Sequence, residues 1–144
     1  MNFKTLGLVL CLVLSGMFVS STVNAQEHPN YMHALSNLRT ARWMLDHRPG
    51  NWKQSRDEEA AEREINDAIR EIHEATIDDH RGMDEHEKWA EHSDRGGRLR
   101  DAKEFLNRAK QNMERAEDFK GLKGRILRHI SESQRFVDMA MNAR

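Results

Sequence analysis

Apolar residues recur along this chain at alternating steps of three and four positions, and this repeat constrains the fold more than any other feature. After Pro29 the repeat runs through Tyr31, Ala34, Leu38, Ala41 and Leu45. Because an α-helix turns once every 3.6 residues, positions with this spacing share one helix face. The repeat returns through Ala61, Ile65, Ala68, Ile72 and Ala75, through Leu99, Ala102, Leu106, Ala109, Met113 and Ala116, and through Ile126, Ile130, Ser133, Val137 and Ala140. The sequence therefore predicts four amphipathic helices.

Helix-breaking and helix-capping residues separate the four segments. Pro49 and Gly50 both oppose continuation of the first helix, and the stretch DFKGLKG at 118–124 interrupts the chain before the fourth. The second segment opens with Ser55 and, three residues later, Glu58, which is the spacing of a capping box.

The expected fold is all-α, an antiparallel four-helix bundle in a single domain at 26–144. Each helix has about 20 residues and a length of roughly 30 Å, and matched lengths favour an antiparallel bundle. Because short loops join neighbouring helices, we expect two helical hairpins at 29–77 and 98–143, joined by an acidic connector at 78–97.

Large residues occupy heptad position a of this repeat, and mostly Ala or Ser occupy position d. Alternating large and small layers interdigitate closely, so the centre leaves little room for a cofactor. Secreted four-helix cytochromes hold haem between a Met and a His, and Met32 and His129 invite that comparison. In this heptad phase, however, Met32 faces outward and His129 flanks the core, and the chain has no Cys-x-x-Cys-His motif. We therefore expect no cofactor.

Residues 1–25 have the pattern of a secretory signal peptide. An apolar run from Leu6 to Leu14 follows a single Lys, and the segment ends in small residues at Ala25. The run is shorter than the roughly 20 residues that span a bilayer. The only cysteine, Cys11, lies within it. We expect cleavage after Ala25, a secreted or periplasmic location and no stable membrane insertion of the mature chain.

The charge of the chain is nearly balanced, with 24 acidic and 23 basic residues. This balance provides no electrostatic footprint for nucleic acid. The chain has no phosphate-binding loop, no sequence context for a Ser-His-Asp triad and no cysteine beyond Cys11. We therefore expect a protein that is not an enzyme.

The segment HEATIDDHRGMDEHEKWAEHSD at 73–94 concentrates histidines and carboxylates, which are ligands for zinc, copper and nickel. Its candidate metal ligands are His73, Asp79, His80, His86 and His92. The four histidines are 7, 6 and 6 residues apart, whereas a helix presents paired ligands at i,i+3 or i,i+4. The spacing favours a solvated connector, and a metal-binding segment is the alternative.

A basic cluster surrounds the expected start of the fourth helix. Its members are Lys120, Lys123, Arg125, Arg128 and His129. Because cations at a helix start oppose the helix dipole, an anion site is an alternative to a solvated face, although the solvated face is the simpler account.

Three residues are candidate partner contacts. Met32 and Trp43 fall on the side of the first helix that faces away from the bundle centre, and Trp89 lies in the connector. An exposed Trp often marks a contact. The alternative is that the loop at 48–55 folds back over Trp43.

The stretch HPNYMHALSNLRTARWML at 28–45 resembles a group of small exported bacterial helical proteins without an assigned function, in which a His-Pro start precedes an Ala/Leu-rich, Arg-containing first helix. The stretch DRGGRLRDAKEFLNRA at 94–109 is similar to a Gly-Gly-His-Arg helix start in related hairpins, but Arg98 replaces that His and Leu99 that Arg. A ligand role for the His is therefore not carried over. The resemblance implies a secreted helical bundle and supplies no activity.

These patterns together favour an exported, non-enzymatic helical bundle that acts by binding a protein partner, by self-association or by scaffolding in the cell envelope. A metal-binding or metal-buffering protein that uses residues 73–94, with a divalent transition metal as its ligand, is the alternative.

Overall fold

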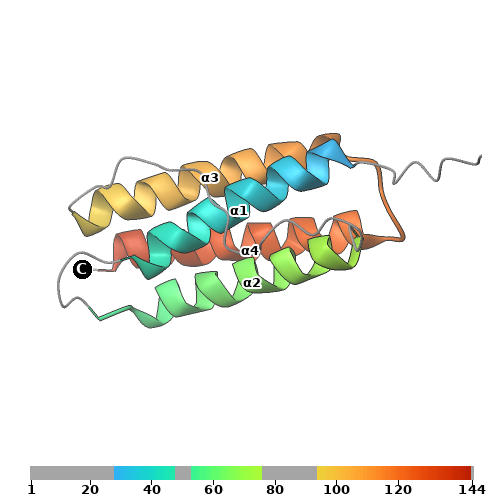
Figure 1. Ribbon diagram of the computed structural model, residues 1–144. Coiled ribbons are helices and arrows are strands. Elements are labelled where there is room, and N and C mark those ends of the chain that lie inside the picture. The colour runs from blue at the N-terminus through green and yellow to red at the C-terminus, as the bar shows by residue number, and fades with distance from the viewer. Residues whose placement is uncertain (1–27, 48–52, 76–93, 144) are drawn as a thin grey trace, which may run out of the picture.

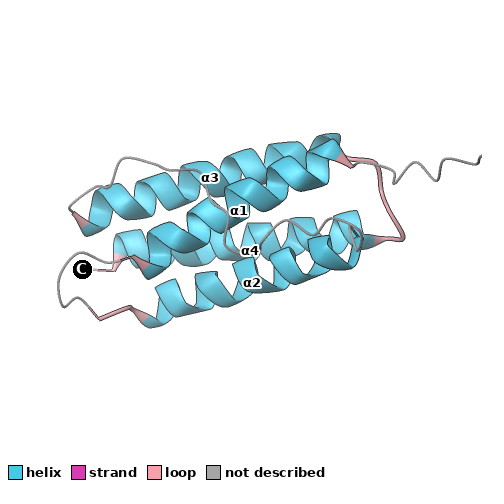
Figure 2. Cartoon of the chain, in the orientation of Figure 1, coloured by secondary structure: helices cyan, strands magenta, loops and turns pink. Residues whose placement is uncertain are grey.

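The computed structural model describes residues 28–47, 53–75 and 94–143, and this part of the chain contains four α-helices and no strand. The helices are α1 (Pro29–Asp46), α2 (Arg56–Ala75), α3 (Arg95–Arg115) and α4 (Leu122–Asn142). They pack side by side as a bundle (Figure 1), and Figure 2 shows the same elements by type. The prediction of an all-α bundle of four helices is therefore confirmed for the described residues. None of the described helices has the length and apolar character that a membrane span requires. The predicted signal peptide lies outside the described residues.

Local sequence explains where two of the helices begin. Ser55 and Glu58 form the predicted capping box: the Ser55 N–H donates to Glu58 Oε2 at 2.7 Å, and the Glu58 N–H donates to Ser55 Oγ at 3.2 Å. At the start of α3 the Asp94 side chain accepts a hydrogen bond of 2.7 Å from the Gly97 N–H. This cap sets the start of α3 at Arg95, inside the last residues of the predicted connector 78–97.

Each helix packs against two of the other three. α1 packs most extensively against α3, and α2 against α4, whereas α1 with α4 and α2 with α3 are diagonal pairs whose backbones do not approach closely. α1 and α3 run in opposite directions (Figure 1). At one end of this pair Asn30 Nδ2 donates to the Arg115 carbonyl at 3.3 Å, and at the other Arg98 donates to the carbonyls of Met44 and Leu45.

The core consists of the predicted alternating layers. The large residues Leu38, Ile65, Leu106 and Ile130 are fully buried. The small residues of the intervening layers are fully buried as well, at Ala34, Ala41, Ala61, Ala68, Ala102 and Ala109. Close approach of the helices therefore depends on these alanines.

The buried face of the helices is wider than the predicted stripe. Leu35, Ile69 and Phe105 are also buried, although they lie beside the predicted core positions. Because every helix contacts two neighbours, its buried face extends past positions a and d. For the same reason Met32 and Trp43, which we expected to face away from the centre, are partly buried and packed against the core.

A buried ion network joins three helices at one end of the bundle. Arg98, only 3% exposed, reaches the last carbonyls of α1 and lies 3.4 Å from Glu58 Oε1, while Arg95 Nη2 lies 3.0 Å from Glu58 Oε2. Burial by itself raises the pKa of Glu58, but hydrogen bonds from Arg95 and Ser55 outweigh it and lower that pKa below its ordinary value. Glu58 is therefore a paired structural anion.

Candidate metal centre

Of the predicted metal ligands, the structure describes only His73. His73 lies on α2, where its Nε2 is 3.4 Å from Nη2 of the buried Arg39 of α1. Asp79, His80, His86 and His92 lie outside the described residues. The metal-binding interpretation of 73–94 therefore stays a prediction.

Of the candidate partner contacts, Trp89 also lies outside the described residues. The Trp43 ring stacks on the His47 ring, with 4.5 Å between the ring centroids. Together with its packing against the core, this contact gives Trp43 an intramolecular role, and Met32 packs against the same core.

A different group of metal-ligating side chains lies between α2 and α4. Glu64 and Asp67 are one turn apart on α2, His129 faces them from α4, and one ligand atom from each lies within 4.8 Å of the other two. His129 Nδ1 is 2.7 Å from Glu64 Oε2. The three side chains are partly accessible, with 16% of the surface of His129 and 28% of that of Glu64 exposed. An ion can therefore reach them from solvent.

A further carboxylate lies on the other side of the imidazole ring. Glu71 Oε1 is 3.7 Å from His129 Nε2 and 3.6 Å from Arg125 Nε. Glu71 is buried, and its second oxygen, Oε2, has no hydrogen-bond partner. A buried carboxylate oxygen without a donor is costly, so this part of the cluster still has capacity to accept a hydrogen bond.

The geometry of Glu64, Asp67 and His129 fits a zinc-class ion. Zinc binds imidazole nitrogen and carboxylate oxygen at about 2.0–2.2 Å, so two ligands of one ion lie at most about 4 Å apart. The atoms lie within 4.8 Å of one another, and a side-chain movement of less than about 1 Å brings them into range. Asp67 is also paired with Arg70 at 2.7 Å, but the Arg70 side chain is 66% exposed and such a pair contributes only about 0–1 kcal/mol.

The basic cluster predicted near the start of α4 is largely occupied by contacts within the chain. Lys123 Nζ donates to the carbonyls of Glu114 and Ala116, at 2.8 and 2.7 Å, and so caps the end of α3. Arg125 faces Glu71 and His129 faces Glu64. These contacts favour a role for the cluster in joining helices over the anion-binding alternative.

The structure does not bring together the residues considered for haem. Met32 is on α1 and His129 is on α4, and these helices are a diagonal pair whose backbones do not approach closely. His129 faces the carboxylates of α2 instead.

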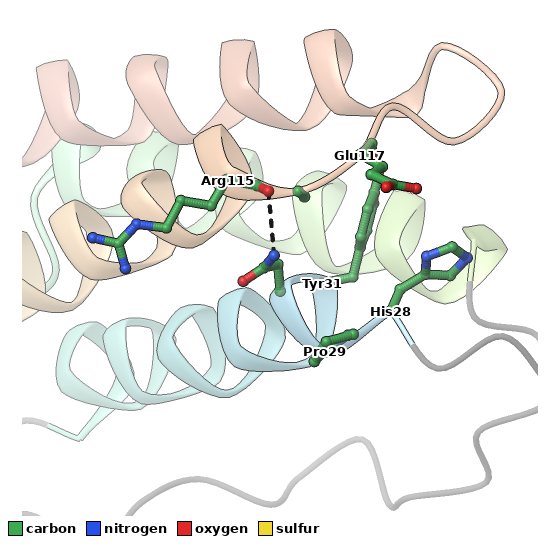
Figure 3. A pocket seen from close by; sticks show the side chains of 7 residues that line it. His28, Pro29, Tyr31, Arg115 and Glu117 are labelled. Atoms are coloured by element: carbon green, nitrogen blue, oxygen red, sulfur yellow. Dashed lines mark hydrogen bonds between the residues drawn. The ribbon is translucent and has the colours of Figure 1, made fainter.

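A hollow of about 330 Å³ lies at the end of the bundle where α1 begins (Figure 3). Its lining residues are His28, Pro29, Asn30, Tyr31, Arg115, Ala116 and Glu117. The Tyr31 hydroxyl donates to the Glu117 carbonyl at 3.0 Å and accepts from the Phe119 N–H at 3.3 Å. Burial raises the pKa of this hydroxyl. These polar groups are hydrogen-bonded to one another. They are therefore less available to bind a ligand than the side chains of the cluster between α2 and α4.

The sequence patterns did not single out Glu64 or Asp67, and they pointed to His129 only for haem and for anion binding. The sequence feature that connects His129 with the glutamates of α2 is their heptad position. Glu64 and Glu71 precede the buried Ile65 and Ile72, and His129 precedes the buried Ile130, so all three occupy the same flanking heptad position. Residues at that position meet across helix pairs, but the sequence does not say that α2 and α4 are such a pair.

Comparison of the chain with protein-family models, with curated proteins and with solved structures found no match.

Proposed function

We propose that the protein binds a divalent metal ion of the zinc class between α2 and α4. The observation that carries the proposal is the convergence of Glu64, Asp67 and His129, from two helices, within 4.8 Å. One imidazole and two carboxylates are a ligand set that zinc accepts, and three protein ligands leave a coordination position for water. In this proposal the protein holds or buffers the ion and is not an enzyme.

Calorimetric titration of the protein with zinc tests the proposal. We expect one equivalent to bind, and His129→Gln to abolish this binding because it removes the imidazole ligand. His33→Gln, at an exposed position of α1, is the matched control and leaves binding intact.

The same titration separates this site from the segment predicted at 73–94. A variant with His80, His86 and His92 all changed to Ala keeps the equivalent if the ion lies between α2 and α4. If that variant loses the equivalent and His129→Gln keeps it, the site lies in the 73–94 segment and our assignment is wrong.

We also propose that α1 with α2 and α3 with α4 form antiparallel hairpins. Spin labels at the exposed residues Asp46 and Arg56 should then be close, whereas labels at Asp46 and Glu74 should be separated by nearly the length of a helix, about 30 Å. Equal separations for the two pairs would contradict the hairpins.

We further propose that residues 1–25 direct export. Mass spectrometry of the protein from the secreted or periplasmic fraction should find Gln26 at the N-terminus. Recovery of only the uncleaved chain from membranes would contradict export.

Partner binding or scaffolding is the second candidate function, and exposed methionines favour it. Met139 and Met141, near the end of α4, are 43% and 38% exposed, and Met is common on surfaces that bind partners. We expect the pair of substitutions Met139→Lys and Met141→Lys to reduce cross-linking to a partner or to a second copy while the helicity is unchanged. Unaltered cross-linking would count against these two methionines as partner contacts.

A further inference from the structure

We infer that Glu71 is a positioning residue for the proposed ion: when the ion binds, Glu71 accepts the Nε2–H of His129 and so holds the ring in the tautomer that presents Nδ1 to the metal. This inference rests on the proposed function and adds the atom that binds the ion and the residue that orients it.

The imidazole of His129 lies between two carboxylates with different roles. Glu64 Oε2 is 2.7 Å from Nδ1, and Glu64 belongs to the group of three converging ligands. Glu71 is on the Nε2 side, at 3.7 Å, and is not part of that group. The ion therefore belongs on the Nδ1 side of the ring, and Glu71 lies outside its ligand shell.

The position of the ring proton follows from this arrangement. A neutral imidazole carries one proton, and a nitrogen that binds a metal must be free of it. A ring that donates its Nδ1–H to Glu64 therefore has to carry its proton on Nε2 before Nδ1 can bind the ion. Glu71 is the acceptor for that Nε2–H, in the carboxylate–histidine–metal arrangement that commonly supports metal-bound histidines.

The burial of Glu71 favours this role. Its Oε1 faces the ring and its Oε2 is buried without a hydrogen-bond partner, so a donor that moves toward this carboxylate reduces the cost of burying it. The present separation of 3.7 Å is longer than a hydrogen bond. A small movement of the ring toward Glu71 shortens it and opens space beside Glu64 for the ion. Arg125 Nε, 3.6 Å from the same Oε1, favours the negative charge of this carboxylate.

Zinc titration of three variants tests the inference. We expect Glu71→Leu to weaken zinc binding by about 10-fold to 100-fold, because Nε2–H loses its acceptor. Glu71→Gln retains a side-chain oxygen at the same position and should recover most of the affinity, which a merely structural role for the negative charge would not allow. Glu74→Leu, at an exposed position of the same helix, is the control and should bind zinc like the unaltered protein.

Nitrogen-15 NMR of the unaltered protein with zinc tests the tautomer without any variant. We expect His129 Nδ1 to be metal-bound and Nε2 to be protonated. Zinc on Nε2, or equal zinc affinity for Glu71→Leu and the unaltered protein, overturns the inference but leaves the proposed function standing if His129→Gln still abolishes binding. Failure of the unaltered protein to bind zinc overturns both.

Discussion

Two of the polar clusters that join helices in this bundle differ in how completely their buried carboxylate oxygens are partnered. The network of Glu58, Arg95 and Arg98 is at one end, and both Glu58 oxygens face guanidinium groups. The cluster of Glu64, Asp67, Glu71 and His129 is partly open to solvent, and one Glu71 oxygen has no partner. Buried charges are tolerated when they are paired. The first cluster therefore stabilises the fold, whereas the second still has groups that can bind a ligand.

Removal of Arg98, the buried cation of the first cluster, should have the largest effect on stability. Arg98→Ala leaves Glu58 buried with Arg95 as its only cation and removes the Arg98 donor from the last carbonyls of α1. We expect the free energy of unfolding to fall by about 3–5 kcal/mol, as for other broken buried pairs. Urea unfolding measures this change, with the exposed Arg100→Ala as the control. A loss below about 1 kcal/mol would show that the network resembles a surface ion pair.

Zinc binding at the second cluster should raise the free energy of unfolding by a smaller amount. An ion that binds only the folded chain adds roughly 2.7 kcal/mol when its concentration is a hundred times its dissociation constant. Thermal melts with and without zinc should show this gain in the unaltered protein and none in His129→Gln. The same shift in both proteins would mean that zinc binds elsewhere.

Acid should weaken the first cluster. The folded pKa of Glu58 is below its ordinary value of 4.5, so the stabilisation is complete well above that value and is lost as the pH falls toward the folded pKa. Urea unfolding between about pH 6 and pH 3 should therefore show a decline that is shallower in Glu58→Gln, which has no carboxylate to protonate. The same pH dependence in Glu58→Gln and in the unaltered protein would contradict the lowered pKa of Glu58.

The smallest effect on stability is expected from Glu64→Gln in the absence of metal. The contact between Glu64 and His129 is partly exposed, and Gln still offers an acceptor, so the change should be within about 1 kcal/mol. The same substitution should greatly weaken zinc binding, because it removes a charged ligand. A large loss of stability without metal would mean that this cluster, like the network of Glu58, Arg95 and Arg98, stabilises the fold.

The helices and much of the core were predictable because their signals are local. The positions of the buried Leu38 and Ile65 follow from the 3.6-residue period, and the start of α2 follows from the Ser55–Glu58 spacing. The wider buried face that includes Phe105 was not predicted. Its burial depends on how many neighbours each helix has, and the period of a single helix does not contain that information.

The sequence by itself determined that the described part of this chain forms four amphipathic helices with alternating large and small core layers. Only the tertiary structure decided which helices are neighbours. The packing of α2 against α4 brings His129 to Glu64 and Asp67, which are 65 and 62 positions away in the chain. The physical reason is that periodicity and capping depend on residues within one or two turns, whereas a site between helices depends on the packing of whole helix faces.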